Sequence, residues 1–355
     1  MRRFFPLAAA GMLLLTGCGG QTVPAETPTT RQIIAMDTVV QFAVYGQGAG
    51  ETVQAAVEQV QELERLLDRT EADSQISLLN RQAGELTAVD ETVYELVDAA
   101  LTYSRETAGC FDITVAPVMD AWGFATEDQR VPERAELEGL LPRVDSGLMT
   151  LEAGTPPRIA LAEGQAIDLG GIAKGYASDC MAALFAQREV ERGWVSLGGN
   201  VLAWGTRPDG QPWQIGVQDP RYPNEERVVG LVGLEDAFAV TSGGYQRYFE
   251  KDGVTYHHII DPATGYPAEG GLTSVTVVAP AETTENGPEN GTLCDALSTA
   301  LFVMGEERAL DFWRTSGQGF DLILVTEDGR VLVTAGIGDA FTPDEESGYV
   351  YETVS

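Results

Sequence analysis

The sequence predicts an α+β fold, and three patterns along the chain support this prediction. Apolar side chains recur with helical spacing at 51–69 and again at 90–107. From about residue 158 onward, short strand-like runs are separated by glycine turns, and helices are expected only near 171–187 and 294–313. Because helices and strands do not alternate regularly, a doubly wound parallel sheet is not expected.

The remaining elements follow from local patterns. Residues 33–45 alternate between apolar and polar side chains, as in a strand that ends at Gly46. The segment 127–145 is polar and bounded by prolines, so we expect a surface excursion with a short helix. Near the C-terminus, the apolar runs 322–326 and 331–334 flank an Asp-Gly turn and predict a hairpin.

The N-terminal segment has the features of a bacterial lipoprotein signal. Two arginines precede a short apolar stretch, and the Leu-Thr-Gly-Cys sequence that ends at Cys18 resembles a lipobox. We therefore expect 1–17 to be cleaved, Cys18 to be lipidated, 18–31 to form a flexible tether and 32–355 to form one domain. The acyl chains would hold the protein on the extracytoplasmic face of the cell membrane. An ordinary secretory signal with an incidental cysteine is the alternative.

Charge restricts the possible partners. The chain has 355 residues and a formal net charge of −32, from 54 acidic and 22 basic side chains. Too little positive charge is available to displace counterions from a nucleic acid, so nucleic-acid partners are excluded. Only two lysines, Lys174 and Lys251, and two histidines, His257 and His258, are present, so chemistry that needs either residue type has few candidates.

A glycine turn followed by a helix start is the most informative segment. An apolar strand runs to Asp168, Gly170 and Gly171 turn the chain, and Lys174 lies in the first turn of the expected helix. The exposed N–H groups and the dipole at a helix N-terminus favour a phosphate, and the glycines let a ligand approach the backbone. An ordinary glycine turn with a solvated lysine would give the same pattern.

A second segment has oxygen donors at helical spacing. Asp295 and Thr299 are four residues apart, so they lie on the same face of a helix. A carboxylate and a hydroxyl form a pair of hard oxygen ligands suited to Mg²⁺, with carbonyl and phosphate oxygens completing the coordination. The alternative is structural, with Asp295 capping the helix and Thr299 bonding back to its own backbone.

The histidine pair supplies the candidates for a base. His257 and His258 lie in a strand-like run that ends in an Asp-Pro-x-Thr-Gly turn, so they are expected to point to opposite faces. A base that takes a proton from a hydroxyl needs a pKa near neutrality, which unperturbed histidine has. At most one of the two is therefore expected in a site, and a structural role is the alternative for either.

Taken in order along the chain, these segments resemble the ApbE-type FAD:protein FMN transferases, and the resemblance spans about residues 33–335. Each motif alone is weak, but their occurrence in the family's order is specific. The motifs lie at 36–38, 73–80, 111–117, 122–124, 168–176, 198–200, 241–243, 258–265 and 295–299.

The resemblance implies a T-fold-like α+β architecture and a defined reaction. FAD, bound with Mg²⁺ or Mn²⁺, would be split at its pyrophosphate, FMN would pass to a Thr or Ser hydroxyl of an acceptor protein, and AMP would leave. The acceptor would belong to a membrane-associated flavin redox system. The alternatives are an FAD pyrophosphatase, which gives FMN and AMP, and a non-catalytic flavin-binding or solute-binding lipoprotein.

The resemblance also assigns roles to residues. His258 would be the base at the reacting phosphate. The metal would be held by the backbone carbonyl of Gly171 and by the side-chain oxygens of Asp295 and Thr299, with Ser298 close by. The FAD site would be formed by Met36, Trp122, Gly123, Phe124, Asp168, Lys174, Ser242 and Asp261.

Two features depart from the family pattern, and both lie beside the expected metal site. Cys294 occupies a position where alanine is more usual, which places a soft thiol next to a hard-metal ligand. The insertion at 286–291 makes the loop before the metal-binding helix longer than is common.

Overall fold

The computed structural model describes residues 26–124, 126, 128–281 and 289–355. The expected signal peptide, the lipidated Cys18, residues 18–25 of the tether and residues 286–288 of the insertion lie outside the described residues. In the part of the chain that the structure describes, no helix is long and apolar enough to cross a bilayer.

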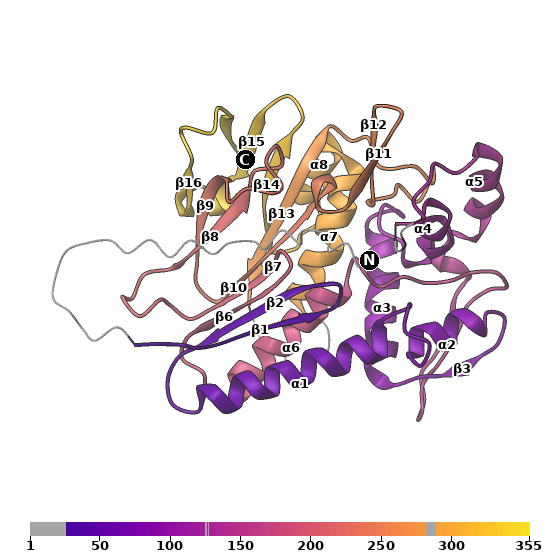
Figure 1. Ribbon diagram of the computed structural model, residues 1–355, viewed down its shortest axis with the longest axis horizontal. Helices are drawn as coiled ribbons and strands as arrows, with labels where there is room; N and C mark the ends of the chain where they lie inside the picture. The colour runs from indigo at the N-terminus through magenta and orange to yellow at the C-terminus, as the bar shows by residue number, and fades with distance from the viewer. Residues whose placement is uncertain (1–25, 125, 127, 282–288) are drawn as a thin grey trace.

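A nine-stranded sheet forms the centre of the fold, in the order β1-β2-β6-β7-β10-β13-β14-β15-β17 (Figure 1). Every neighbouring pair is antiparallel except β15 and β17, which are parallel. The strands are β1 (Thr29–Ala35), β2 (Thr38–Val44), β6 (Gly193–Leu197), β7 (Asn200–Trp204), β10 (Ala237–Gly243), β13 (Leu272–Pro280), β14 (Asp321–Thr326), β15 (Arg330–Thr334) and β17 (Val350–Val354).

Helices cover one face of this sheet. Long helices α1 (Ala49–Leu67), α6 (Ala173–Gln187) and α7 (Asn290–Met304) pack on the strands and on one another, with α3 (Glu91–Glu106) and α8 (Glu306–Thr315) beside α7 (Figure 1). Their buried side chains form one apolar cluster with the inner face of the sheet. Burial of this area provides the main stabilisation of the fold.

A second, smaller sheet covers the opposite face. It consists of β8 (Trp213–Gln218), β9 (Val228–Leu234) and β16 (Phe341–Pro343), in the order β16-β9-β8. Side chains alternate across a strand, so Val277 packs in the helical core while its neighbour Val278 packs under the small sheet. The inner strands of the central sheet, such as β13 and β14, are therefore buried on both faces, whereas the edge strands β1 and β17 are largely exposed.

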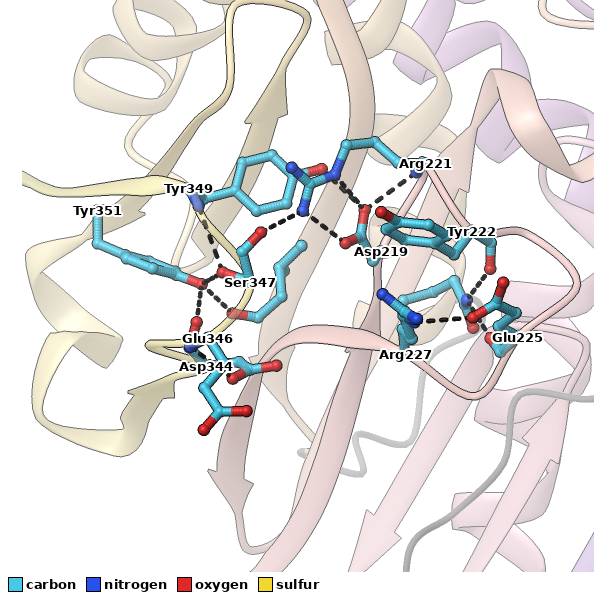
Figure 2. Close-up of polar contacts among 12 residues, drawn as sticks. Asp219, Arg221, Tyr222, Glu225, Arg227, Asp344, Glu346, Ser347, Tyr349 and Tyr351 are labelled. Carbon is cyan, nitrogen blue, oxygen red and sulfur yellow. Dashed lines mark hydrogen bonds and ion pairs between the residues drawn. The ribbon is translucent and has the colours of Figure 1, made fainter.

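A cluster of paired polar groups fixes the C-terminal segment to the connection between β8 and β9 (Figure 2). Arg221 donates to both carboxylate oxygens of Asp219, and the hydroxyl of Tyr349 donates to the same carboxylate at 2.9 Å. The guanidinium of Arg221 lies 3.8 Å from the centre of the Tyr349 ring. Burial acts to raise the pKa of Asp219, but these hydrogen bonds hold it below its ordinary value.

Shorter elements complete the chain and include those that carry the site. A two-stranded hairpin pairs β11 with β12, and a three-stranded sheet has the order β3-β5-β4. These elements are α2 (Gln75–Arg81), β3 (Thr87–Ala88), α4 (Ala116–Trp122), α5 (Arg134–Leu140), β4 (Thr150–Glu152), β5 (Arg158–Ala160), β11 (Tyr248–Lys251) and β12 (Val254–His257).

The α+β prediction is confirmed, and most of the expected elements are present. Helices α1 and α3 match the predicted apolar stripes, and α6 is the helix expected near 171–187. Helix α5 is the short helix of the polar excursion, and β14 and β15 form the predicted hairpin. Strand β1 begins at Thr29, inside the segment that was expected to be a tether.

Two predicted elements are wrong in the same way, because each is interrupted by residues with positive φ. The strand predicted over 33–45 is a hairpin, since Met36 and Asp37 have φ of 51° and 57° and turn β1 into β2. The helix predicted over 294–313 is two helices, because Gly305, with φ 76°, ends α7 and precedes α8.

Candidate functional site

His258 lies immediately after β12, at the base of the β11–β12 hairpin. Its backbone N–H donates to the carbonyl of Arg247 at 3.0 Å, and its Nδ1 lies 3.1 Å from the same oxygen. A carbonyl can only accept, so Nδ1 carries the proton and Nε2 keeps a free electron pair. Burial, with the nearby charge of Arg247, lowers the pKa of His258 to about 3. The imidazole is therefore neutral at physiological pH with its electron pair at Nε2 available, but its pKa lies well below the near-neutral value that was expected of a base.

His257 has a structural role. Its Nε2 donates to the carbonyl of Ala268 at 3.1 Å, and its Nδ1 accepts the N–H of Ile259 at 3.3 Å. Its ring meets Phe302 edge-on, with 5.4 Å between the ring centres. Both nitrogens are used, so this histidine holds the segment that carries His258 against helix α7.

The turn before α6 brings a lysine to a carboxylate. Lys174, in the first turn of α6, donates from Nζ to the carbonyl of Gly170 at 2.9 Å, and the same nitrogen lies 3.8 Å from Oδ1 of Asp295. The other oxygen of Asp295 accepts the N–H of Gly175 at 2.8 Å. Lys174 is therefore held against α7 and is not a solvated lysine. Its charge is also close enough to His258 to contribute to the lowered pKa of that residue.

Oxygen donors gather where α7 passes the turn. The hydroxyl of Ser242, on β10, lies 2.8 Å from that of Ser298 and 3.3 Å from that of Thr299. Ser298 also donates to the carbonyl of Asp295 at 2.9 Å. A Cβ added to Gly171 would lie 3.5 Å from the Thr299 hydroxyl, so the glycine lets the turn approach α7 closely. The structure thus brings the hydroxyls of Ser242, Ser298 and Thr299 together and packs Gly171 beside Thr299, while the carboxylate of Asp295 faces Lys174 and Gly175.

The chemistry of this donor set fits a hard divalent cation. It offers one carboxylate, hydroxyls and a backbone carbonyl, which are the oxygen ligands that Mg²⁺ prefers. Within the described ranges, no three His, Cys, Asp or Glu side chains are grouped in a way that could hold a metal. A cation here would therefore depend on Asp295 for protein charge and on a ligand's phosphates for the rest.

A second turn reaches Arg247, the residue whose carbonyl bonds to His258. The N–H of Met36 donates to Oε1 of Glu64 at 2.7 Å, and the carboxylate of Asp37 lies 4.0 Å from the guanidinium of Arg247. Gly198, with φ 60°, packs so closely on Thr38 that a Cβ would overlap its hydroxyl. The sequence motifs at 36–38 and 198–200 are therefore two turns in contact.

The aromatic residues predicted for the FAD site form a buried cluster. Trp122 has no exposed surface, and its Nε1 donates to the carbonyl of Gly265 at 2.8 Å. Phe124 stacks on Trp122, and Gly123 ends α4 with φ 75°. Trp122 therefore presents no surface to a ligand, and it supports three partly exposed rings, those of Phe249, Tyr256 and Tyr266.

Phe249 and Tyr256 were not predicted from the sequence. They face each other across the β11–β12 hairpin, on either side of the Lys-Asp-Gly sequence at 251–253, which was a readable turn signal. The predicted ligand residue Asp261 caps the following turn, where it accepts the N–H of Ala263 at 2.9 Å. Its assignment to FAD stays a prediction.

Asp168 has a partner that was also missed. Its Oδ2 accepts from Nε of Arg69 at 2.6 Å, and its Oδ1 accepts the N–H of Gly170 at 2.8 Å. Arg69 follows α1 and also donates to Asp120, on α4, at 2.8 Å. Arg69 and Asp168 are 99 residues apart, so no local pattern could have paired them.

Comparison with known proteins identifies the family of this chain. The model of the ApbE family matches residues 36–324, and this chain belongs to that family. A protein of Treponema pallidum named FAD:protein FMN transferase is 33% identical over 340 residues, which are 91% of this chain and 90% of that protein. The protein of the same name from Escherichia coli K12 is 30% identical, with 92% and 93% covered.

Solved structures show the same architecture. The ApbE protein of Thermotoga maritima matches with a TM-score of 0.77 and 33% identity, covering 90% of this chain and 98% of that one. The apo flavinyl transferase ApbE of Pseudomonas stutzeri matches with a TM-score of 0.77 and 25% identity, covering 90% and 99%. The residues that the family model matches, 36–324, include every segment of the site.

Proposed function

We propose that this chain transfers FMN from FAD to a Thr or Ser hydroxyl of an acceptor protein, with Mg²⁺ bound and with AMP as the second product. The observation that carries the proposal is a neutral histidine whose pKa is lowered in part by Lys174, the lysine that is held against Asp295 on α7. His258 has a free electron pair at Nε2. The charge of Lys174 contributes to the lowered pKa of His258, and the ammonium group of the same lysine lies 3.8 Å from the carboxylate of Asp295. The relatives named FAD:protein FMN transferase support the choice of substrate and reaction.

In this mechanism the base acts on the acceptor. Nε2 of His258 takes the hydroxyl proton as the oxygen attacks the FMN phosphorus of FAD. The bond from that phosphorus to the bridging oxygen breaks, and AMP leaves with the oxygen. The hydrogen bond from Nδ1 to Arg247 keeps the imidazole oriented throughout and stabilises its protonated form.

The other residues bind and neutralise the pyrophosphate. Gly171, Asp295, Ser298 and Thr299 would hold the cation, which would offset negative charge on the phosphates when bound. Lys174 would contribute a second positive charge at the same place, since only 3.8 Å separates it from Asp295. An acidic protein can bind an acidic dinucleotide in this way, because the positive charge is local.

Anchoring is part of the proposal. Lipidation at Cys18 would hold the domain on the extracytoplasmic face of the membrane, near an acceptor that belongs to a flavin redox system there. The high negative charge of the chain would keep the domain from lying on anionic lipid.

Mass spectrometry of an acceptor tests the proposal. The mature chain would be incubated with FAD, Mg²⁺ and an acceptor domain that carries a candidate Thr, and AMP would be quantified in parallel. The proposal expects an acceptor that gains one FMN and loses one water. AMP and FMN without a labelled acceptor would instead identify an FAD pyrophosphatase, and FAD binding without either product would identify a binding protein.

A further inference from the structure

An arginine outside the proposed catalytic set lies between two carboxylates at the edge of the site. Arg69 donates from Nε to Asp168 at 2.6 Å and from Nη2 to Asp120 at 2.8 Å. Only 13% of its side chain is exposed. A guanidinium that binds two acceptors through fixed, coplanar N–H groups holds both in a defined geometry.

Hydrogen bonds connect Arg69 to the turn from Asp168 to Lys174, which is proposed to bind the phosphates of FAD. Asp168 uses its second oxygen to accept the N–H of Gly170 at 2.8 Å, and the carbonyl of Gly170 accepts from Nζ of Lys174 at 2.9 Å. A continuous path of hydrogen bonds therefore joins Arg69 to Lys174. Gly171, whose carbonyl is a proposed metal ligand, is the next residue in the same turn.

Helix α2 holds both the arginine and the residue that precedes Asp168. Ser77 donates to the backbone carbonyl of Arg69 at 2.7 Å. Asn80 exchanges two hydrogen bonds with the backbone of Ile167, at 2.8 and 3.0 Å, directly before Asp168. The sequence motif at 73–80 thus holds the arginine and the start of the turn from one short helix.

The local net charge argues against a role for Arg69 in binding phosphate. Its single positive charge faces the two carboxylates of Asp120 and Asp168, so the group of three is net negative and does not attract an anion. We propose that Arg69 is a positioning residue that acts through Asp168 to hold the turn from Asp168 to Lys174 in the geometry that binds FAD. This inference rests on the proposed FAD site, and it goes beyond the proposed function by assigning a role to Arg69.

A set of four variants tests the inference. Arg69→Gln removes the positive charge and the forked guanidinium that donates to both Asp168 and Asp120, whereas Arg69→Lys keeps the charge without this fork. Asp168→Ala removes the acceptor of the Arg69 hydrogen bond. A double variant combines Arg69→Gln with Asp168→Ala. Arg65→Gln is the matched control, because this exposed arginine in the last turn of α1, four residues before Arg69, pairs only with Glu62 among its described contacts. Thermal unfolding of each variant would separate loss of the fold from loss of the site.

FAD affinity is the primary measurement, from quenching of flavin fluorescence with EDTA present and again with Mg²⁺. Loss of a residue that orients a ligand-binding group weakens binding by about 10- to 100-fold, so we expect this loss for Arg69→Gln and none for Arg65→Gln. Arg69→Lys should recover part of the affinity. The double variant should bind as weakly as Asp168→Ala alone, because both changes act on one path.

Two results would overturn the inference. One is an Arg69→Gln protein that is folded and binds FAD as tightly as the parent. The other is a double variant whose loss is the product of the two single losses, which would mean that Arg69 acts independently of Asp168. If Arg69→Gln does not fold, Arg69→Lys decides, since unchanged affinity in that variant refutes a need for the fork. A parent that binds FAD without transferring FMN would refute the proposed function and leave this test intact.

Discussion

The role of His258 gives a prediction that separates chemistry from binding. Replacing His258 with Gln removes the electron pair at Nε2 and keeps a polar side chain of similar reach. Because general-base catalysis contributes about 10²- to 10⁴-fold, we expect the rate of FMN transfer to fall by that factor. FAD affinity should stay the same, since the imidazole bonds to Arg247 and takes no part in the proposed metal site.

The lowered pKa of His258 sets the expected pH dependence. For an imidazole with the ordinary pKa of 6.5, the neutral fraction would fall about tenfold between about pH 7.5 and about pH 5.5. With a pKa of about 3, His258 remains neutral over this whole range. The value of kcat/KM, which reports the free enzyme, should therefore not show an acid limb near pH 6.5.

The assay is initial-rate flavinylation of the acceptor at several pH values, with FAD affinity measured in parallel. His257→Gln is the comparison, because this residue makes two structural hydrogen bonds. It should lower the free energy of unfolding by about 1 kcal/mol per lost bond and leave the pH profile unchanged. Normal turnover in His258→Gln would remove this residue from the role of base.

Three further outcomes are expected from the structure. Asp295→Ala should reduce Mg²⁺-dependent turnover by at least about 100-fold, since a bound cation supplies several kcal/mol of charge stabilisation; a titration with Mg²⁺ checks this, and an unchanged half-saturation would contradict it. Gly198→Ala should lower the free energy of unfolding by about 1–3 kcal/mol for backbone strain, plus a further loss from overlap with Thr38. Gly210→Ala, with φ 77° and open space around it, should lose only the part that comes from backbone strain. Urea unfolding compares the two variants, and equal losses of stability would refute the close packing of Gly198 on Thr38. As pH falls from the unfolded-state pKa of about 6.5 towards 3, the unfolded chain binds a proton that native His258 does not, so the parent should lose stability relative to His258→Gln; equal pH slopes of the melting temperature would contradict this.

The elements that the sequence predicted well were those with a strong local signal. The apolar stripes of α1 and α3 have the period of a helix and bury one face each, so periodicity was sufficient. Asp295 and Thr299 were correctly placed on one helix, α7, where a spacing of four residues brings two side chains to the same face. Gly305 carried a readable signal for the end of α7, since glycine often ends a helix, and this signal was missed.

Other features depend on contacts between distant parts of the chain. Met36 and Asp37 take positive φ without being glycine, because the neighbouring Gly198 turn and Glu64 hold them there. The pairing of Arg69 with Asp168 exists only after α1 has packed beside the start of α6. The tautomer of His258 depends on the carbonyl of Arg247, which reaches it across the β11–β12 hairpin.

The stoichiometry of the two products tests the central claim most directly. AMP release and FMN bound to the acceptor would be quantified in the same reaction, for the parent and for Asp295→Ala, with Mg²⁺ or with EDTA. For the parent with Mg²⁺ we expect one AMP for each flavinylated acceptor. We expect neither product when Asp295 or the cation is removed. AMP that forms without flavin on the acceptor, or transfer that continues in EDTA, would contradict it.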